Sequence, residues 1–321
     1  MRAMKKAVHL AGVGYAVIFG FTFLFSKTAL LYVSPIGLIS YRFLVAFLAF
    51  EGLRLFKVVK IRFLRGAWRL WLPAALCEPI LYFLFESFGL SQATSGEAGM
   101  MLAMIPIFVA LLSMLVLRER PRPIQIFFIL LSVAGILLIQ FLAPGSGDGG
   151  RIVGFLLLFA AVLAAAFFNI ASKKALATLT PFEITYFMMM SAAIAFNAIY
   201  LVQLAFGDGL SGYVTALFHP ELAAPILYLG IVASIGGFFL VNVALSKLPP
   251  HVSSIYSNLS TVVAIAAGAV FLDESIRYYH LIGSAMILVG VYGTIRSQGL
   301  ARSGSDPAAS SPLSPGEKNL L

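Results

Sequence analysis

The sequence contains little charge, and this scarcity excludes most classes of soluble protein. Only 11% of the 321 residues are charged, whereas 60% are hydrophobic and the mean hydropathy is +0.97. A soluble globular chain is about half apolar and about a quarter charged, so one water-facing fold could not bury this much apolar surface. Runs of about 20 apolar residues indicate membrane spans, and the chain contains many. We therefore expect an integral membrane protein.

The chain also lacks the residues that many enzymes and metalloproteins require. Cys77 is the single cysteine, which rules out an internal disulfide and a cysteine-based zinc cluster. The sequence has no P-loop, no H-E-x-x-H motif and no G-x-S-x-G motif. Its four histidines lie at the ends of apolar runs or between them and form no ligand cluster. We expect no enzymatic activity, no cofactor and no metal.

Ten apolar segments are long enough to be transmembrane helices. Backbone polar groups in lipid must be hydrogen-bonded within each segment, which favours helices throughout. The first segment is longer than the apolar part of a signal peptide, so we expect a retained span. The expected spans are 8–31, 34–55, 69–91, 95–117, 123–142, 152–172, 182–206, 222–246, 251–272 and 278–296.

The basic residues are distributed unevenly between the two sides that these spans define. Of the 22 Lys and Arg residues, 18 lie on the side of the termini, and only Arg151 and Arg277 lie on the other side. Lys27 and Arg42 fall inside spans. This bias follows the positive-inside rule, so we expect a multi-pass protein of the cytoplasmic membrane with both termini in the cytoplasm. Topology thus explains the net charge of +9, and we expect no nucleic-acid partner.

Two halves of five spans each repeat the same sequence pattern. The stretch "FSKTALLYVSP" ends at Pro35, and "ASKKALATLTP" ends at Pro181, 146 residues later. Later in each half the offset is 155, as between Gly135 and Gly290. Because each half has an odd number of spans, the second half crosses the membrane in the opposite sense. We therefore expect an inverted repeat, an architecture of secondary transporters whose sites lie near the midplane between the halves.

The boundaries of the units follow from this repeat. We expect one five-helix unit over 8–142, a Gly-rich linker over 143–151 and a second unit over 152–296. Residues 297–321 are rich in Ser, Pro and Gly without an apolar period, which predicts a disordered cytoplasmic tail. The predicted fold is an all-α integral membrane protein with ten transmembrane helices in two inverted five-helix repeats.

Long motifs occur in order in both halves. The first half carries "YFLFESFGLSQATSGEAGMMLAMIPIFVALLSMLVLRER", and the second carries "YLGIVASIGGFFLVNVALSKLPPHVSSIYSNLSTVVAIAAGAVFLDES". Over residues 8–296 the chain resembles the EamA-type ten-helix transporters of the drug/metabolite transporter (DMT) superfamily. The resemblance implies a cavity lined mainly by spans 1, 3, 4, 6, 8 and 9, and alternating access. It implies a permease for a small organic solute, such as an amino acid, a related metabolite or a drug, with efflux the favoured direction.

Ionisable residues inside the spans are the first candidates for a functional site, because a charge in lipid is costly unless it pairs or lines a pathway. Glu78, Tyr82 and Glu86 stand at i, i+4 and i+8 in the third span, which predicts one shared helix face. Arg42 and Lys27 lie at a depth from which they can reach Glu86. We interpret this group as a substrate-binding or coupling site, with a proton as the candidate coupling ion. The alternatives are a structural ion pair for Arg42 and Glu86, and a snorkelling side chain for Lys27.

The second half offers neutral polar groups in place of charges. Asn169, Asn242, Tyr256 and Asn258 lie on spans that the resemblance assigns to the cavity. Met101 in the fourth span would add an adaptable apolar wall. The alternatives are interhelical hydrogen bonding for the polar groups and packing for Met101. For the whole protein, a passive channel or facilitator is the alternative to a carrier, and a membrane enzyme has less support.

Overall fold

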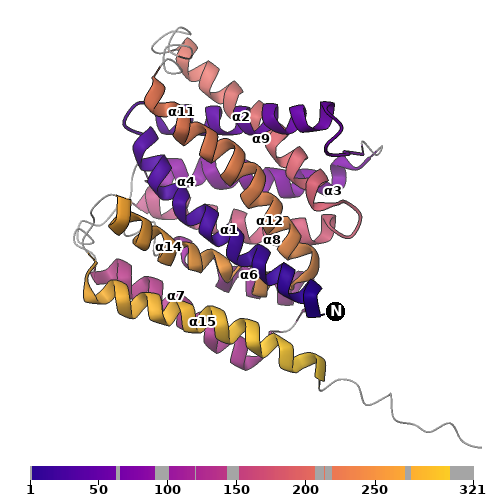
Figure 1. The fold of residues 1–321 in the computed structure, drawn as a ribbon, viewed down its shortest axis with the longest axis vertical. Helices are drawn as coiled ribbons and strands as arrows, with labels where there is room; N and C mark the ends of the chain where they lie inside the picture. Colours follow the sequence, from indigo (N-terminus) through magenta and orange to yellow (C-terminus); the bar gives the residue numbers. More distant parts are fainter. Residues whose placement is uncertain are drawn as a thin grey trace, which may run out of the picture.

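The polypeptide folds into a bundle of helices, without strands in the residues that the structure describes (Figure 1). The structure is a computed structural model, and it describes residues 2–62, 66–90, 101–119, 121–142, 152–206, 213, 219–271 and 276–303. Short connections join the helices within these ranges. The all-α prediction is therefore confirmed.

The helices fall into two sets in chain order. The segment η1 contains a kink with a non-helical residue, and the segment η2 is π-helical. The first half contains α1 (Arg2–Ala29), α2 (Pro35–Leu55), α3 (Trp68–Ala75), η1 (Leu76–Leu81), α4 (Tyr82–Leu90), α6 (Ile105–Val116) and α7 (Pro123–Leu142). The second half contains α8 (Ile152–Ala175), α9 (Pro181–Ala205), α11 (Pro220–Leu227), η2 (Tyr228–Gly237), α12 (Phe238–Lys247), α13 (Pro250–Ser253), α14 (Tyr256–Phe271) and α15 (Tyr278–Ser303).

Eight helical segments of the described chain are long and apolar enough to cross a membrane. Shorter apolar helices, Ile105–Val116 and Pro123–Ile139, occupy the positions of the other two expected spans. Residues 91–100, which include the predicted start of the fourth span, lie outside the described residues. Large apolar side chains cover the outside of the bundle, and Leu115, Ile152 and Val270 are each more than 70% exposed. Such surfaces suit contact with lipid.

The repeated sequence words mark the start of equivalent helices. The hydroxyl of Ser34 accepts a hydrogen bond from the backbone N–H of Gly37 at 3.2 Å, and Pro35 opens α2. Thr180 caps α9 in the same way, before Pro181. Ser or Thr at the N-cap and Pro at the first helical position are strong start signals. The last residues of the two repeated motifs, Pro35 and Pro181, therefore begin the second and seventh spans.

The packing of α2 against α9 shows that the repeat is inverted. Ser40, near the start of α2, donates a hydrogen bond to Asn197, near the end of α9, at 2.8 Å. Tyr186, near the start of α9, donates to Glu51, near the end of α2, at 2.9 Å. The offset of 146 converts Ser40 into Tyr186 and Glu51 into Asn197. The equivalent helices α2 and α9 thus pack antiparallel. The same pair of equivalent positions is hydrogen-bonded at both ends of the helix pair.

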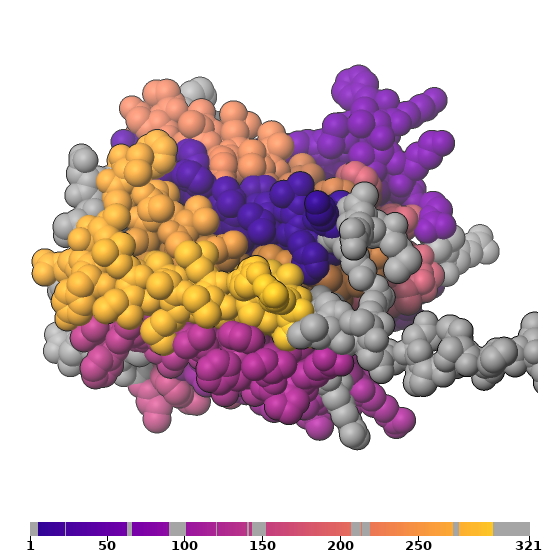
Figure 2. All heavy atoms as spheres, turned by 60° about the horizontal axis from the view of Figure 1, so that its bottom comes forward, coloured from indigo at the N-terminus to yellow at the C-terminus, as the bar shows by residue number. Residues whose placement is uncertain are grey.

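Helices α7 and α15 form a second such pair and lie side by side along one face of the molecule (Figure 2). A Cβ atom added to Gly135 would lie 2.6 Å from the carbonyl oxygen of Gly283. A Cβ atom added to Gly290 would lie 2.6 Å from the carbonyl oxygen of Phe128. The offset of 155 converts the first contact into the second, so glycine permits the same close approach twice.

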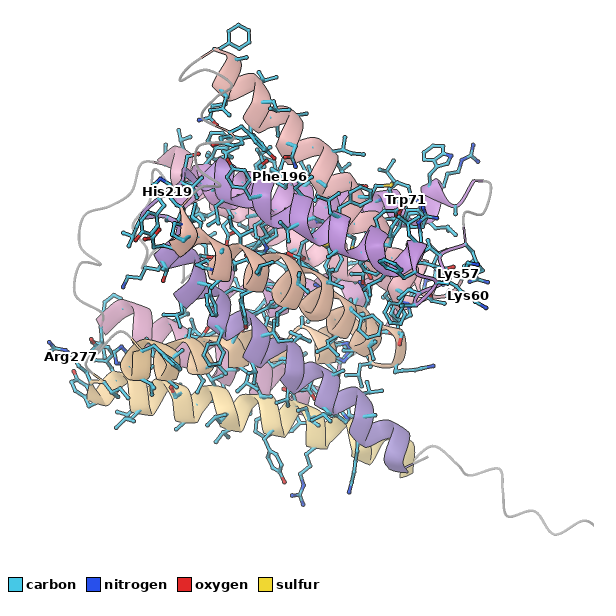
Figure 3. The ribbon with its side chains drawn as sticks, turned by 45° about the horizontal axis from the view of Figure 1, so that its top comes forward. Lys57, Lys60, Trp71, Phe196, His219 and Arg277 are labelled. Atoms are coloured by element: carbon cyan, nitrogen blue, oxygen red, sulfur yellow. The ribbon has the colours of Figure 1, made fainter. Side chains whose placement is uncertain are left out.

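Residues from loops that the sequence assigns to opposite sides lie at opposite ends of the bundle. Lys57, Lys60 and Trp71 lie at one end, and His219 and Arg277 lie at the opposite end (Figure 3). The last helix, α15, continues to Ser303. The segment 297–303 is therefore helical and does not belong to a disordered tail, because the helix runs past the last apolar turn of the span. The rest of the predicted tail, 304–321, lies outside the described residues.

Candidate functional site

The third and eighth spans both depart from a regular α-helix at equivalent positions: the third is kinked in η1, and the eighth is π-helical in η2. In η1, Glu78 has the non-helical angles φ −144° and ψ 123°, and Pro79 follows it without an N–H to continue the helical hydrogen bonds. The offset of 155 moves Leu76–Leu81 onto 231–236, which lies inside η2. Because π-helical turns often occur at functional sites, the groups around these two interruptions are the natural candidates.

Arg42 of α2 lies between the two interrupted spans. Its side chain is buried, and its Nε donates a hydrogen bond to Ser234 Oγ in η2 at 2.8 Å. Its guanidinium carbon lies 4.9 Å from the ring centroid of Phe83 in α4. A charge-assisted hydrogen bond and a cation–π contact both stabilise a buried cation. Arg42 thus contacts the third and the eighth span, which belong to different halves.

Three side chains of the third span interact electrostatically with Arg42. Glu86 is its strongest electrostatic neighbour, followed by Tyr82 and Glu78. The Tyr82 hydroxyl donates a hydrogen bond to Glu86 Oε1 at 2.9 Å, as their i, i+4 spacing predicts. The predicted helix face does not extend to Glu78, because the backbone leaves the helix there. Glu78 nevertheless interacts electrostatically with both Arg42 and Glu86.

The chemistry of this cluster suits a polar solute in a membrane. Glu78, Tyr82 and Glu86 are each partly accessible, so they are not sealed in the apolar core. A guanidinium can pair with a carboxylate, and a glutamate can accept an ammonium group or a proton. The cluster therefore presents complementary charges to a small zwitterion. The described residues contain no group of three or more His, Cys, Asp or Glu side chains that could hold a metal ion.

Two further candidates from the sequence occupy different surroundings. Lys27 is exposed in the last turn of α1, which agrees with the snorkelling alternative. Met101 is buried and packs in an apolar cluster with Leu158 and Val162 of α8. Its contacts favour the packing alternative.

The asparagines of the second half chiefly join helices. Asn242 in α12 is fully buried, donates to Thr185 Oγ1 of α9 at 3.0 Å and accepts from Ser172 Oγ of α8 at 2.5 Å. Asn258 in α14 donates to Ser132 Oγ of α7 at 3.1 Å. These contacts favour interhelical hydrogen bonding, because each amide links different helices.

Asn169 and Tyr256 also have protein partners. Asn169 Nδ2 donates to the carbonyl oxygen of Ala165 in its own helix at 2.9 Å. The Tyr256 hydroxyl lies 2.6 Å from His9 Nδ1 of α1. Neither residue is among the electrostatic neighbours of Arg42 named above. The structure brings together Arg42, Glu78, Tyr82 and Glu86 from the predicted set.

The sequence reading missed Ser234 and Phe83, which hold Arg42 in place. Ser234 had a signal, because the offset of 155 pairs it with Pro79 beside the interrupted backbone of η1. Phe83 had none, since an apolar residue in a span is common. Ser234 Oγ also donates to the carbonyl oxygen of Leu229 at 2.8 Å, five residues back in the π-helical turn.

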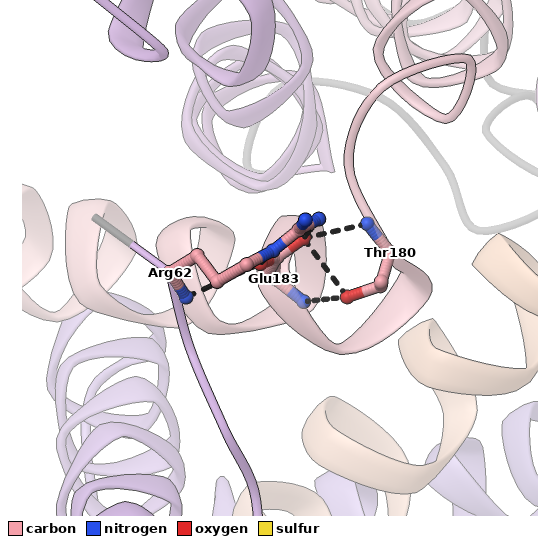
Figure 4. Close-up of polar contacts among 3 residues, drawn as sticks. All are labelled: Arg62, Thr180 and Glu183. Carbon is pink, nitrogen blue, oxygen red and sulfur yellow. Dashed lines mark hydrogen bonds and ion pairs between the residues drawn. The ribbon is translucent and has the colours of Figure 1, made fainter. Parts of the chain in front are cut away.

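A separate ion pair connects the loop after α2 to the start of α9 (Figure 4). Arg62 Nε donates to Glu183 Oε1 at 2.7 Å, and the Glu183 carboxylate also accepts from the backbone N–H of Thr180 at 2.7 Å. The neighbouring carboxylate raises the pKa of Arg62. Glu183 is therefore part of a helix cap and is not part of the cluster around Arg42.

An inverted repeat of helical spans, with ionisable groups gathered around Arg42 between the third and eighth spans, is the architecture of a multi-pass membrane transporter of small solutes. The chain belongs to the EamA-like transporter family, whose model matches residues 6–141 and 152–296. It is 35% identical to the uncharacterized transporter YcxC of Bacillus subtilis over 294 residues, covering 92% of this chain and 94% of the relative.

Other relatives carry more specific names. The chain is 27% identical over 281 residues to a "Probable amino-acid metabolite efflux pump" of Escherichia coli, covering 86% of this chain and 90% of that protein. It is 25% identical over 216 residues to a "Probable terminal-alkyne amino-acid exporter" of Streptantibioticus cattleyicolor, covering 65% of this chain and 67% of the exporter. A crystal structure at 18% identity shares the fold, with a TM-score of 0.75 over 94% of this chain and 99% of the other.

Proposed function

We propose that this protein is a secondary active transporter that exports an amino acid or a related small metabolite across the cytoplasmic membrane by alternating access. The observation that carries the proposal is the position of Arg42 between the kinked third span of the first half and the π-helical eighth span of the second half, beside two carboxylates. A site at the junction of inverted halves can face either side of a membrane when the halves rock. The names of the two exporters among the relatives support the solute class and the direction.

The proposed roles follow from charge. Arg42 binds the carboxylate of the solute, and Glu86 binds its ammonium group or carries a coupling proton. Tyr82 orients Glu86 through its hydrogen bond, and Ser234 orients Arg42. Glu78 adds a second carboxylate beside the interrupted backbone. Alternating use of one site by solute and proton would couple their fluxes.

The orientation is proposed from the basic residues. The end of the bundle that carries Lys57 and Lys60 would face the cytoplasm, and the end with His219 and Arg277 would face outward (Figure 3). The termini would then be cytoplasmic, and the first and second five-helix units would be 8–142 and 152–296.

Counterflow in proteoliposomes tests the proposal against a passive channel. Vesicles are loaded with one unlabelled amino acid at a time, and uptake of the same labelled amino acid is followed with and without a pH gradient. A carrier gives transient accumulation that depends on internal solute, since each return of the site carries a molecule. Flux that rises linearly with concentration and ignores internal solute would instead support a channel. No protein-dependent flux for any amino acid would overturn the solute class.

A further inference from the structure

Unpartnered polar atoms gather at the end of the bundle that would face the cytoplasm. Among the described residues, the buried side-chain atoms without a hydrogen-bond partner are Ser113 Oγ, Glu119 Oε2, His251 Nδ1, Ser253 Oγ and Ser254 Oγ. Ser113 and Glu119 belong to α6 and the residues after it, and the other three belong to α13 and its connection to α14. Helices α6 and α13 pack against each other. Buried polar groups normally have partners, so this concentration indicates a ligand site.

Glu119 and His251 face each other within the cluster. Glu119 Oε2 and His251 Nδ1 are 3.9 Å apart, and the His251 side chain is only 5% exposed. In the histidine tautomer that carries its proton on Nε2, Nδ1 and a carboxylate oxygen are both acceptors, so no hydrogen bond can form between them. One added proton supplies the missing donor, and a closer approach of the two atoms then forms the hydrogen bond. The ligand that fits this gap is therefore a proton.

The surrounding charges fit this assignment. From α8, Lys173 interacts electrostatically with Glu119, while its Nζ donates to the carbonyl oxygens of Leu245 and Leu248 at 2.8 and 2.9 Å. Lys247, at the end of α12, repels Lys173. Beside Glu119 in the chain, Arg118 is exposed.

Helix α1 also contributes a tyrosine to the cluster. The Tyr15 hydroxyl donates a hydrogen bond to the Ser253 carbonyl oxygen. Burial raises the pKa of the Glu119 carboxyl, and Lys173 opposes that shift in part.

We propose that Glu119 and His251 form a proton-binding site at the cytoplasmic end, and that a proton bound between them holds the first half against the second. Glu119 follows α6 of the first half, whereas His251 lies in α13 of the second half. The inference deepens the proposed function and rests on it, because the halves of an alternating-access carrier separate here when the site opens inward. The bound proton then favours the state that is closed to the cytoplasm.

The sign of the pH effect follows from linkage. A group that binds a proton more tightly in the closed state stabilises that state at low pH, and the stabilisation is lost as pH rises through its pKa in the closed state. Each unit of difference in pKa between the open and closed states changes their ratio about tenfold. Opening toward the cytoplasm should therefore increase with pH.

Thiol labelling measures this opening without any cargo. In a Cys77→Ala background, Ser254→Cys places a thiol in the cluster, where the native hydroxyl has no partner. Inside-out vesicles expose the cytoplasmic side to a membrane-impermeant maleimide, from about pH 5.5 to about pH 8.5, a range above the ordinary pKa of a carboxyl group in which a carboxyl with a raised pKa titrates. Each rate is divided by the rate for Lys60→Cys, an exposed loop position, which removes the intrinsic effect of pH on the thiol.

We expect the normalised rate to rise about tenfold across this range. Glu119→Gln and His251→Gln should each flatten the profile, because neither amide takes up the proton. Lys174→Met, the matched control at an exposed neighbour of Lys173, should keep it.

A flat profile in the parent, or an unchanged slope in either folded amide variant, would overturn the site. Absent amino-acid flux would overturn the proposed function and leave this result standing.

Discussion

The third and eighth spans depart from a regular α-helix at equivalent positions, but their backbones and their chemistry differ. The third span is kinked at Glu78, whose backbone angles are non-helical, whereas the eighth span is π-helical over Tyr228–Gly237. The offset of 155 converts Glu78, Tyr82 and Glu86 into Ala233, Gly237 and Val241. The kink thus occurs in the span that carries the charges of the site, and the π-helical segment occurs in the span that lacks them.

The asymmetry extends to the helices that face these spans. The offset of 146 converts Arg42 into Met188, so the second half has no matching cation. A Cβ atom added to Gly237 would lie 2.4 Å from the Phe19 ring, and the equivalents of that pair are Tyr82 and Ala165. The pair on the eighth span has the small residue on that span and the large residue on its neighbour, and the pair on the third span has the two sizes exchanged. The fold thus keeps its volume while the polar site belongs to one half.

The largest effect should come from replacing Arg42 with methionine, the residue at the equivalent position of the second half. Arg42→Met leaves the partly accessible carboxylates of Glu78 and Glu86 without their cation, and the loss of one partner from a buried ion pair costs up to about 3–5 kcal/mol. We expect a large loss of thermal stability in detergent and no solute flux. Met188→Leu is the matched control, because a volume-conserving core exchange costs less than about 1.5 kcal/mol. Stability equal to the parent in Arg42→Met would show that the carboxylates do not depend on Arg42.

The sequence predicts the fold well because the signals are strong and local. Three signals can be recognised without knowledge of the tertiary structure. They are the length of the apolar runs, the uneven distribution of basic residues, and the N-cap residues Ser34 and Thr180 that each precede a proline. The repeat offsets then relate contacts that lie far apart, such as Ser40 with Asn197. The sequence predicts the site in part, because a charge inside a span is rare and conspicuous.

The rest of the site depends on packing between helices, which no single residue of the sequence indicates. Regular helical spacing placed Glu78 on the face of Tyr82, but the backbone leaves the helix at Glu78. The π-helical turn of the eighth span contains no proline to signal it, since Pro225 lies in the preceding helix. Ser234 becomes a partner of Arg42 only through the close approach of η2 to α2, where Gly230 faces the Arg42 carbonyl.

Removing the charge of Glu86 tests whether the charged residues of the first half couple transport to protons. We expect a smaller effect than that of Arg42→Met. Glu86→Gln retains the shape and the contact with Tyr82, but it cannot change charge during a transport cycle. A hydrogen bond to a charged group contributes about 1.5–3 kcal/mol, which corresponds to a loss of roughly 10- to 100-fold in apparent affinity. We expect folded protein whose flux no longer responds to a pH gradient.

The matched control for Glu86→Gln is Glu221→Gln, at an exposed position in α11. If Glu86 serves only as the structural partner of Arg42, the variant should instead lose folded protein, and a second change, Arg42→Gln, should restore it. Parental flux and pH dependence in a well-folded Glu86→Gln protein would remove Glu86 from the site.

The smallest effect should come from a substitution of Ser234. The hydroxyl of this residue in the eighth span accepts a hydrogen bond from Arg42 Nε. Ser234→Ala removes that bond and the bond to the Leu229 carbonyl, while Arg42 keeps its carboxylate neighbours. A cost of about 0.5–1.5 kcal/mol is typical of one hydrogen bond, equivalent to roughly 2- to 10-fold in apparent affinity.

Counterflow kinetics separate the two roles that Ser234 can have. If it positions Arg42 for the solute, KM should rise by that factor while the maximal flux stays near the parental value, and Ser234→Thr should recover most of the loss because it restores the hydroxyl. If it only supports the π-helical turn, KM should stay constant and the melting temperature should fall in Ser234→Ala. The second outcome would assign the eighth span to the scaffold and leave solute binding to the first half alone.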